Sequence, residues 1–135
     1  MIPDFADAPQ ADAFFRRLQA FSRLAERFLY GIFLNGRLIG IVNECGRDGN
    51  TVEIGYFTDP AYWNRGYATE AVRAAIGELF RIGWGAVRAG YFEENTASRR
   101  VMEKCGMIPI PEETEIPWRG VSHRCLFCEI RNPKL

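Results

Sequence analysis

Ten residues in the middle of the chain, YWNRGYATEA (residues 62–71), combine residue types that suit an anion-binding turn. Apolar and polar residues alternate before this stretch as in a strand, and apolar residues recur after it at helical spacing. The start of a helix exposes unpaired N–H groups at the positive end of its dipole. Gly66 permits unusual backbone angles, Ala68 is small and Arg65 is a cationic donor. The stretch predicts a phosphate or pyrophosphate site, and a simple glycine-containing turn is the alternative.

A second polar pair lies in ENTASRRVMEKCG (residues 94–106), which has the pattern of a short helix with Asn95 as its N-cap. Asn95 and Ser98 are three residues apart and share one face of the first turn. Met102 follows Ser98 by four residues, so the serine continues the inward-facing stripe of the helix. Asn95 is either a plain cap or a ligand contact, or both. Ser98 either packs the helix or supplies a hydroxyl to a site.

The cysteines do not form a metal-binding pattern. Cys125 and Cys128 have CxxC spacing, but VSHRCLFCEI reads as a strand, in which residues three apart point to opposite faces. There is no second CxxC, and His123 is the only histidine. We expect no metal centre, and ordinary thiols in a reducing compartment.

Composition predicts a soluble, globular single domain over residues 1–135. Hydrophobic residues make up 47% and charged residues 25% of the chain. Basic and acidic residues balance at 17 each, which argues against a large nucleic-acid surface. No apolar run approaches the roughly 20 residues that cross a bilayer. The first ten residues do not resemble a signal peptide, so we expect a cytoplasmic protein without a membrane partner.

The first half of the chain predicts a helix followed by three antiparallel strands. Apolar residues form one helical stripe over residues 9–27. Asn35-Gly36 between two apolar runs is a strong hairpin signal. A second turn at GRDGN leads into the strand TVEIGYFTD.

The second half predicts a β-α-β-α-β succession. A helix begins at Tyr67 or Ala68 and Gly83 closes it, and AVRAGYF is a strand. The shorter helix of residues 94–106 follows. The prolines of MIPIPEETEIPW indicate an irregular stretch before the last strand, GVSHRCLFCEIR. The fold class is therefore α/β or α+β with a mixed sheet flanked by helices.

Two segments, EIGYFTDPAYWNRGYATEAVRAAIGELF and ENTASRRVMEKCGM, resemble the GNAT superfamily of acetyl-CoA-dependent N-acetyltransferases. The branch that contains ribosomal-protein N-terminal acetyltransferases is the most similar. The resemblance covers roughly residues 30–130 and implies two splayed central strands with the cofactor in the gap. Trp63 stands where the family usually has Gln or Arg, a change that this branch commonly tolerates.

The resemblance implies the cofactor contacts. Backbone amides of the glycine-containing loop would bind the pyrophosphate of acetyl-CoA, and the preceding strand end would pair with the pantetheine arm. The loop residues are Asn64, Arg65, Gly66, Tyr67, Ala68 and Thr69, and the strand residues are Tyr56, Phe57 and Thr58.

The second segment would complete the site. In this family branch a serine at the position of Ser98 is a candidate acid that protonates the leaving CoA thiolate, and Asn95 binds the cofactor. Lys104 is either a solvated helix charge or a phosphate contact.

Amide formation also needs a base, because an amine is largely protonated at neutral pH. Related enzymes often have a glutamate at the position of Glu53, which we therefore predict to be the base; the alternative is a strand glutamate that orders a neighbouring loop. Glu129 and Glu93 are reserve candidates. A backbone N–H of the splayed strand would hold the oxyanion.

Family members usually have a strand and a helix before the helix expected at residues 9–27, and only MIPDFADA precedes it here. The first strand is therefore missing, or a partner chain covers that edge of the sheet. Because an uncovered edge is a liability, we expect a homodimer.

The sequence thus predicts an N-acetyltransferase that transfers acetyl directly to a primary amine, a peptide N-terminus or a small molecule, in a ternary complex. The alternative is a truncated relative that binds acyl-CoA as a sensor without turnover. The acidic residues Glu112, Glu113 and Glu115 either attract a cationic amine or belong to a solvated loop.

Overall fold

A computed structural model of the chain describes residues 28–135. The helix predicted at residues 9–27 lies outside the described residues. The strands are β1 (Leu29–Leu34), β2 (Arg37–Asp48), β3 (Thr51–Thr58), β4 (Ala86–Phe92), β5 (Ile108–Trp118) and β6 (Val121–Arg131). The helices are the 3-10 turn η1 (Pro60–Tyr62), α2 (Tyr67–Arg81) and α3 (Thr96–Lys104).

The six strands form one mixed sheet in the order β1-β2-β3-β4-β6-β5. The first three are an antiparallel meander, as the sequence predicts. Asn35 and Gly36 have positive φ angles of 50° and 81°, which confirms the predicted hairpin turn between β1 and β2. The crossover through α2 makes β3 and β4 parallel, whereas β6 runs antiparallel to both of its neighbours.

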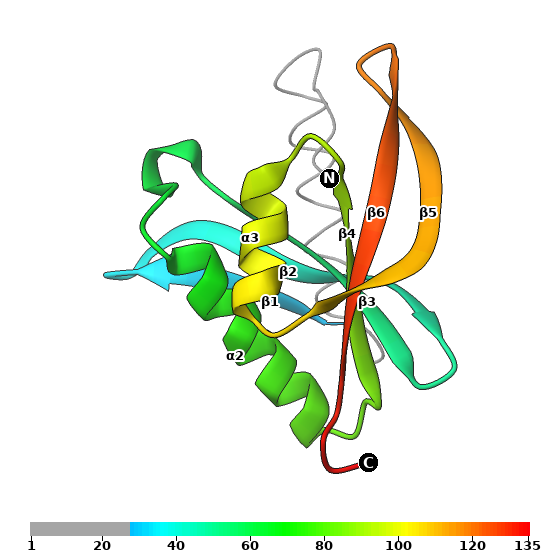
Figure 1. The fold of residues 1–135 in the computed structure, drawn as a ribbon. Helices are drawn as coiled ribbons and strands as arrows, with labels where there is room; N and C mark the ends of the chain where they lie inside the picture. Colours follow the sequence, from blue (N-terminus) through cyan, green and yellow to red (C-terminus); the bar gives the residue numbers. More distant parts are fainter. Residues whose placement is uncertain (1–27) are drawn as a thin grey trace.

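Both α2 and α3 lie on the same side of the sheet and contact each other (Figure 1). The buried side of α2 consists of Val72, Ala75, Ile76 and Leu79, four positions of the predicted apolar stripe. These side chains share one core cluster with alternate residues of the central strands, among them Val52, Ile54, Val87 and Ala89. Residues between those positions, such as Glu53 and Arg88, therefore point to the opposite face of the sheet.

The parallel strands β3 and β4 pair along only part of their length. Their register runs from Thr51 opposite Ala86 to Ile54 opposite Ala89. Beyond that point β3 keeps its pairing with β2 as far as Thr58, and β4 keeps its pairing with β6 as far as Phe92. The two strands thus diverge in the middle of the sheet, which is the splay that the family resemblance implies.

The proline-containing stretch is a strand and not an irregular segment, so this prediction is wrong. Ile108–Trp118 forms β5 at the edge of the sheet, where only β6 pairs with it. An edge strand tolerates proline because one row of its N–H groups needs no partner strand. The register shifts between Ile110 and Glu113, around Pro111. The hairpin of β5 and β6 extends past the end of β4 (Figure 1).

All four cysteines are free thiols. Cys125 and Cys128 lie on β6, as predicted, three residues apart and so on opposite faces of the strand. Among residues 28–135, no helix is long and apolar enough to cross a membrane, and no group of three or more potential ligands could hold a metal ion.

Candidate active site

The helix α2 begins at Tyr67, directly after a turn in which two residues have positive φ angles. Gly66 occupies the N-cap position in the left-handed region with φ of 82°, and Asn64 also has a positive φ of 61°. Glycine and asparagine are the residues that tolerate this conformation best. Gly66 has no side chain to cap the helix, so within the described part of the chain the first N–H groups of α2 are left without an N-cap acceptor, as an anion site requires.

The loop before α2 is fastened to the end of β3. The indole Nε1–H of Trp63 donates to the carbonyl of Thr58 at 2.9 Å. The carboxylate of Asp59 accepts from the N–H of Ala61 at 2.9 Å and so caps η1. The guanidinium of Arg65 lies 6.0 Å from the centre of the Tyr62 ring, within the range of a cation–π contact. Trp63 thus has a structural task in holding the turn beside the strand end.

The end of β3 offers an unpaired backbone edge. Gly55, Tyr56, Phe57 and Thr58 pair with β2 on one side, and the described residues of β4 do not pair with them on the other. An extended ligand that lies in the gap can therefore hydrogen-bond to β3 as an added strand would.

The side chains of Tyr56 and Ser98 meet across the gap between β3 and α3. The phenol hydroxyl of Tyr56 donates to the Ser98 carbonyl at 3.0 Å, and the two hydroxyl oxygens are also 3.0 Å apart. Burial raises the pKa of Tyr56 to about 12, against the opposing effect of the hydrogen bond with Ser98. Tyr56 is therefore protonated at neutral pH, and the pair presents two hydroxyl groups at the gap.

Asn95 is the N-cap of α3, because its side-chain oxygen accepts from the N–H of Ser98 at 3.1 Å. This confirms the capping interpretation. The bond also fixes Ser98 in the first turn of α3, where it faces Tyr56.

The predicted base, Glu53, lies one residue before the point where β3 and β4 separate, on the face opposite α2 and α3. Its side chain is 33% exposed and its Oε1 is 3.7 Å from Nε of Arg88, which is opposite it in the register. Arg88 also binds Glu112 of β5, with 2.6 Å between Nη2 and Oε2. Glu53 is thus reachable by a substrate and has a cationic neighbour.

The two other carboxylate candidates, Glu93 and Glu129, form ion pairs with neighbouring arginines. Glu93 forms an ion pair with Arg124, with 3.2 Å between Oε1 and Nη1. Glu129 is 3.5 Å from Nε of Arg131. Lys104 is the last residue of α3, and its carbonyl accepts from Arg73 at 2.8 Å. The register places Glu129 beside Arg88, in the same row as Glu53, so the row contains two of the three carboxylates considered.

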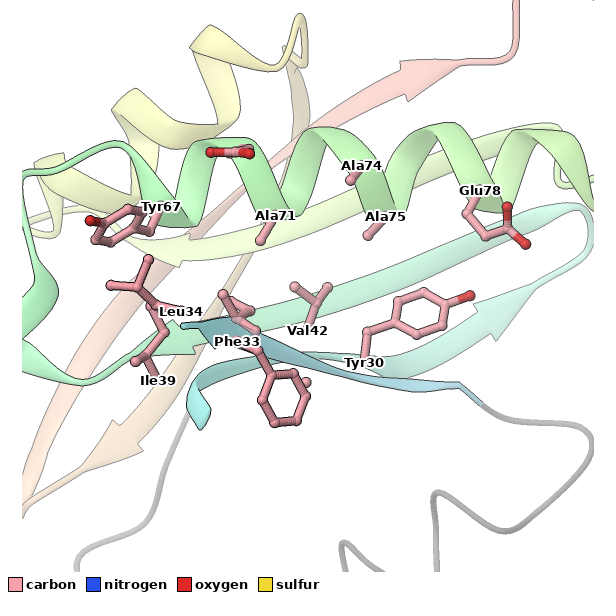
Figure 2. Close-up of a pocket in the computed structure, with 13 residues that line it drawn as sticks. Tyr30, Phe33, Leu34, Ile39, Val42, Tyr67, Ala71, Ala74, Ala75 and Glu78 are labelled. Carbon is pink, nitrogen blue, oxygen red and sulfur yellow. The ribbon is translucent and has the colours of Figure 1, made fainter. Parts of the chain in front are cut away.

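Two cavities flank the site without coinciding with the gap. The larger, of about 480 Å³, lies between α2 and the strands β1 and β2 (Figure 2). Its lining is mainly apolar, and Tyr67 is the one predicted site residue that contributes to it. The smaller, of about 170 Å³, is lined by Gly46, Arg47, Asp48, Thr51, Glu53 and Arg88.

Sequence reasoning missed the Tyr56–Ser98 pair and the position of Arg88. Strand alternation contains part of the signal, because Tyr56 is two residues after the core residue Ile54 and so points toward the helices. No pattern in the sequence says that α3 brings Ser98 to the same point. The pairing of Arg88 with Glu53 depends on the register of two strands that are distant in sequence.

Comparison with known proteins adds an independent line of evidence. A family model described as an acetyltransferase (GNAT) domain matches residues 1–108. A Bacillus subtilis protein described as a probable N-acetyltransferase is 38% identical over 87 residues, which are 60% of this chain and 48% of that protein. The chain thus spans about half the length of this curated relative.

Solved structures show the same fold. The ribosomal-protein-S5-alanine acetyltransferase of Vibrio fischeri superposes with a TM-score of 0.80 at 18% identity, over 98% of this chain and 78% of that chain. A Salmonella typhimurium protein of acetyltransferase type, solved with its cofactor acetyl-CoA, gives a TM-score of 0.74 at 19% identity, over 98% and 78% of the two chains. With the splayed sheet, the uncapped helix after Gly66 and the family match over most of its length, this chain belongs to the GNAT acetyltransferase family.

Proposed function

We propose that the protein is an acetyl-CoA-dependent N-acetyltransferase that moves an acetyl group to a primary amine, a peptide N-terminus or a small molecule, in a ternary complex. The observation that supports this most is the divergence of β3 and β4 after the Ile54–Ala89 pair. It opens a gap between β3 and β4 beside the unpaired edge of β3, and the uncapped start of α2 follows the end of β3 in the chain. Family membership and the acetyl-CoA in a solved structure of the same fold agree with this donor.

In this proposal the turn before α2 binds the pyrophosphate through the backbone amides of residues 64–69. The first N–H groups of α2 point along the helix axis toward the anion, and the helix dipole adds to the attraction. The pantetheine arm runs along Tyr56–Thr58 and pairs with the free edge of β3. Asn95 keeps α3 in place, so its contribution to the cofactor is the position of Ser98.

Glu53 acts as the base and accepts a proton from the substrate ammonium group, directly or through a water molecule. The neutral amine then attacks the thioester carbonyl, a backbone N–H of the splayed strands stabilises the oxyanion, and the C–N bond forms as the C–S bond breaks. The products are the acetylated amine and CoA thiolate, which takes up the released proton.

Ser98 and Tyr56 assist the departure of the thiolate as hydrogen-bond donors. A thiol has an ordinary pKa of about 8.5, well below the value of about 12 for Tyr56, so the thiolate is too weak a base to deprotonate the phenol. Hydrogen bonding by the pair, without full proton transfer, is therefore sufficient to stabilise the leaving group. In this proposal Ser98 therefore donates a hydrogen bond to the thiolate and does not protonate it.

Binding of acyl-CoA as a sensor, without turnover, is the alternative function. Calorimetry with acetyl-CoA tests the proposal first: a dissociation constant below hundreds of micromolar is expected, and no binding at that concentration contradicts both functions. Release of CoA thiol with a broad panel of amines then separates them. An enzyme loses turnover in Glu53→Gln, whereas a sensor shows no thiol release in the wild type and no loss of affinity in Glu53→Gln or Ser98→Ala.

We further propose a homodimer in the cytoplasm. The four free thiols fit a reducing compartment. Among the described residues β1 has a strand partner on one side only, and the large apolar cavity of Figure 2 lies beside this edge. A partner copy that covers the edge would remove an exposed row of backbone groups. Sedimentation at micromolar protein concentration is expected to give a dimer, and a monomer contradicts the proposal.

A further inference from the structure

The smaller cavity lies next to the reaction centre proposed above and has the size for a small acceptor. Glu53 and Arg88, which line it, form the register pair that immediately precedes the last pair between β3 and β4. Both point to the face of the sheet opposite the two helices. A volume of about 170 Å³ is below the range of about 300–1,000 Å³ typical of pockets for drug-sized ligands.

The described residues satisfy the guanidinium of Arg88 only in part. Its Nη2 binds Glu112 at 2.6 Å, but Nε is buried and has no hydrogen-bond partner among the described residues. The nearest carboxylate oxygen, on Glu53, is 3.7 Å away and outside hydrogen-bond distance. Nε itself is closed to a ligand, but a guanidinium has five N–H donors, and those on the exposed part of the group can still bind a ligand carboxylate.

The surroundings of Arg88 hold its guanidinium in place. The side chain is 14% exposed, and its guanidinium carbon lies 4.7 Å from the centre of the Phe127 ring. A fixed, partly desolvated guanidinium binds carboxylates well, because little conformational entropy is lost when the ligand arrives.

The other charged residues that line the cavity are Arg47, Asp48 and Glu53. Arg47 is bound to the carboxylate of Glu44 by two hydrogen bonds, of 2.9 and 3.0 Å, whereas Arg88 has one hydrogen bond, to Glu112, and a longer ion pair with Glu53. Asp48 and Glu53 supply negative charge, which attracts an ammonium group. The cavity therefore offers an anion-binding donor on Arg88 directly beside an ammonium-binding carboxylate on Glu53.

We propose that this cavity is the acceptor site and that the acceptor is a small amino carboxylate, with an α-amino acid as the best fit. Its carboxylate accepts from the guanidinium of Arg88 while its amine gives a proton to Glu53. In an α-amino acid one carbon separates the two groups, and Glu53 and Arg88 are neighbours on strands roughly 4.8 Å apart. The inference rests on the proposed function, since it names the substrate class of the same site.

The test compares each standard L-amino acid with its amide as acceptor, at saturating acetyl-CoA, by release of CoA thiol. The two members of a pair differ in the carboxylate, so at least one amino acid should show a kcat/KM at least tenfold above that of its amide. Arg88→Gln should raise the KM for that amino acid about 10- to 100-fold, the worth of a charge-assisted hydrogen bond, and change the KM for the amide less than threefold. Arg88→Lys should recover part of the loss.

Arg81→Gln is the matched control, because Arg81 is an exposed arginine paired with Glu78 at the far end of α2. It should leave both KM values unchanged. If Arg88→Gln does not fold, calorimetry of the amino acid and its amide with the wild-type protein saturated with CoA replaces it, with tighter binding of the amino acid expected.

The experiments distinguish failure of the amino-carboxylate acceptor from failure of the acetyltransferase function. Equal use of amino acids and amides, or preference for amides, overturns the amino-carboxylate acceptor while thiol release leaves the acetyltransferase function standing. If no amine is acetylated, equal or absent binding of the amino acid and amide overturns the inference by itself. Lack of acetyl-CoA binding overturns the proposed function.

Discussion

Two residues of β3, three positions apart, face opposite sides of the sheet and opposite ends of the proposed reaction. Tyr56 points toward the helices and meets Ser98, where the thiolate would leave. Glu53 points to the other face and borders the cavity where the amine would arrive. Because strand residues alternate, a single strand can serve both partners of a transfer reaction.

Replacement of Glu53 by Gln removes the proposed basic carboxylate and keeps the size of the side chain nearly the same. Loss of a general base typically lowers a rate 10²- to 10⁴-fold, so kcat should fall in that range. The dissociation constant of acetyl-CoA should stay within about threefold, because Glu53 lies on the face away from α2. A kcat within threefold of the wild type would exclude Glu53 as the base and direct attention to Glu129, in the same row of the sheet.

Burial raises the pKa of Tyr56 to about 12, so the stability of the folded protein should depend on pH in the alkaline range. Above pH 10 the unfolded chain releases the phenol proton while the folded chain keeps it, so the free energy of unfolding falls as pH rises from 10 to 12. Two pKa units correspond to roughly 3 kcal/mol. Urea titrations across this range should show a shallower decline for Tyr56→Phe than for the wild type. Equal declines would mean that the phenol is not buried in solution.

The two helices differ at their N-termini: the first turn of α3 is capped by a side chain, and that of α2 is not. Asn95 caps α3 with its own side chain, which leaves one N–H fewer for a ligand. Gly66 leaves the first turn of α2 without a side-chain cap and places the backbone in a left-handed turn. An uncapped helix start in this chain therefore coincides with the predicted pyrophosphate site.

Alanine substitution at Gly66, the N-cap of α2, and at Gly77, inside the helix, separates the effect of the turn from that of the helix. Gly66→Ala forces a Cβ into a φ of 82° and should cost about 1–2 kcal/mol of stability, with weaker acetyl-CoA binding. Gly77→Ala, within the same helix and with nothing within 4 Å of the new Cβ, should stabilise the protein by about 0.5–1 kcal/mol and leave affinity unchanged. Chemical denaturation and calorimetry measure both effects. Equal affinities in the two variants would argue against a cofactor at the turn.

The elements differ in how well the sequence predicts them. The helix at Tyr67 and the hairpin at Asn35-Gly36 follow from local signals, namely apolar periodicity and turn chemistry. The strand β5 does not, because its prolines are local strand breakers that only an edge position makes tolerable. Which strand is at an edge is a property of the whole sheet.

For the whole molecule, the gap between β3 and β4 predicts where the cofactor changes the dynamics. Backbone amides of residues 55–58 that face the gap have no strand partner among residues 28–135 and should exchange with solvent quickly in the free protein. Acetyl-CoA should protect these amides in hydrogen-exchange measurements. At one hundred times its dissociation constant it should add about 2.7 kcal/mol to the free energy of unfolding and so raise the melting temperature. The amides of β2 and β6 serve as internal controls. Protection confined to other segments would place the cofactor outside the gap.

The sequence by itself determined the local parts of this protein: the glycine turn at Gly66 that starts a helix, the helical face that carries Ser98, and the family to which both belong. Tertiary structure alone decided three features: the divergence of β3 and β4, the contact between Tyr56 and Ser98, and the approach of Arg88 to Glu53. The reason is physical. Turn and helix signals act over a few residues, whereas strand register and helix docking are fixed by the packing of a core assembled from the whole chain.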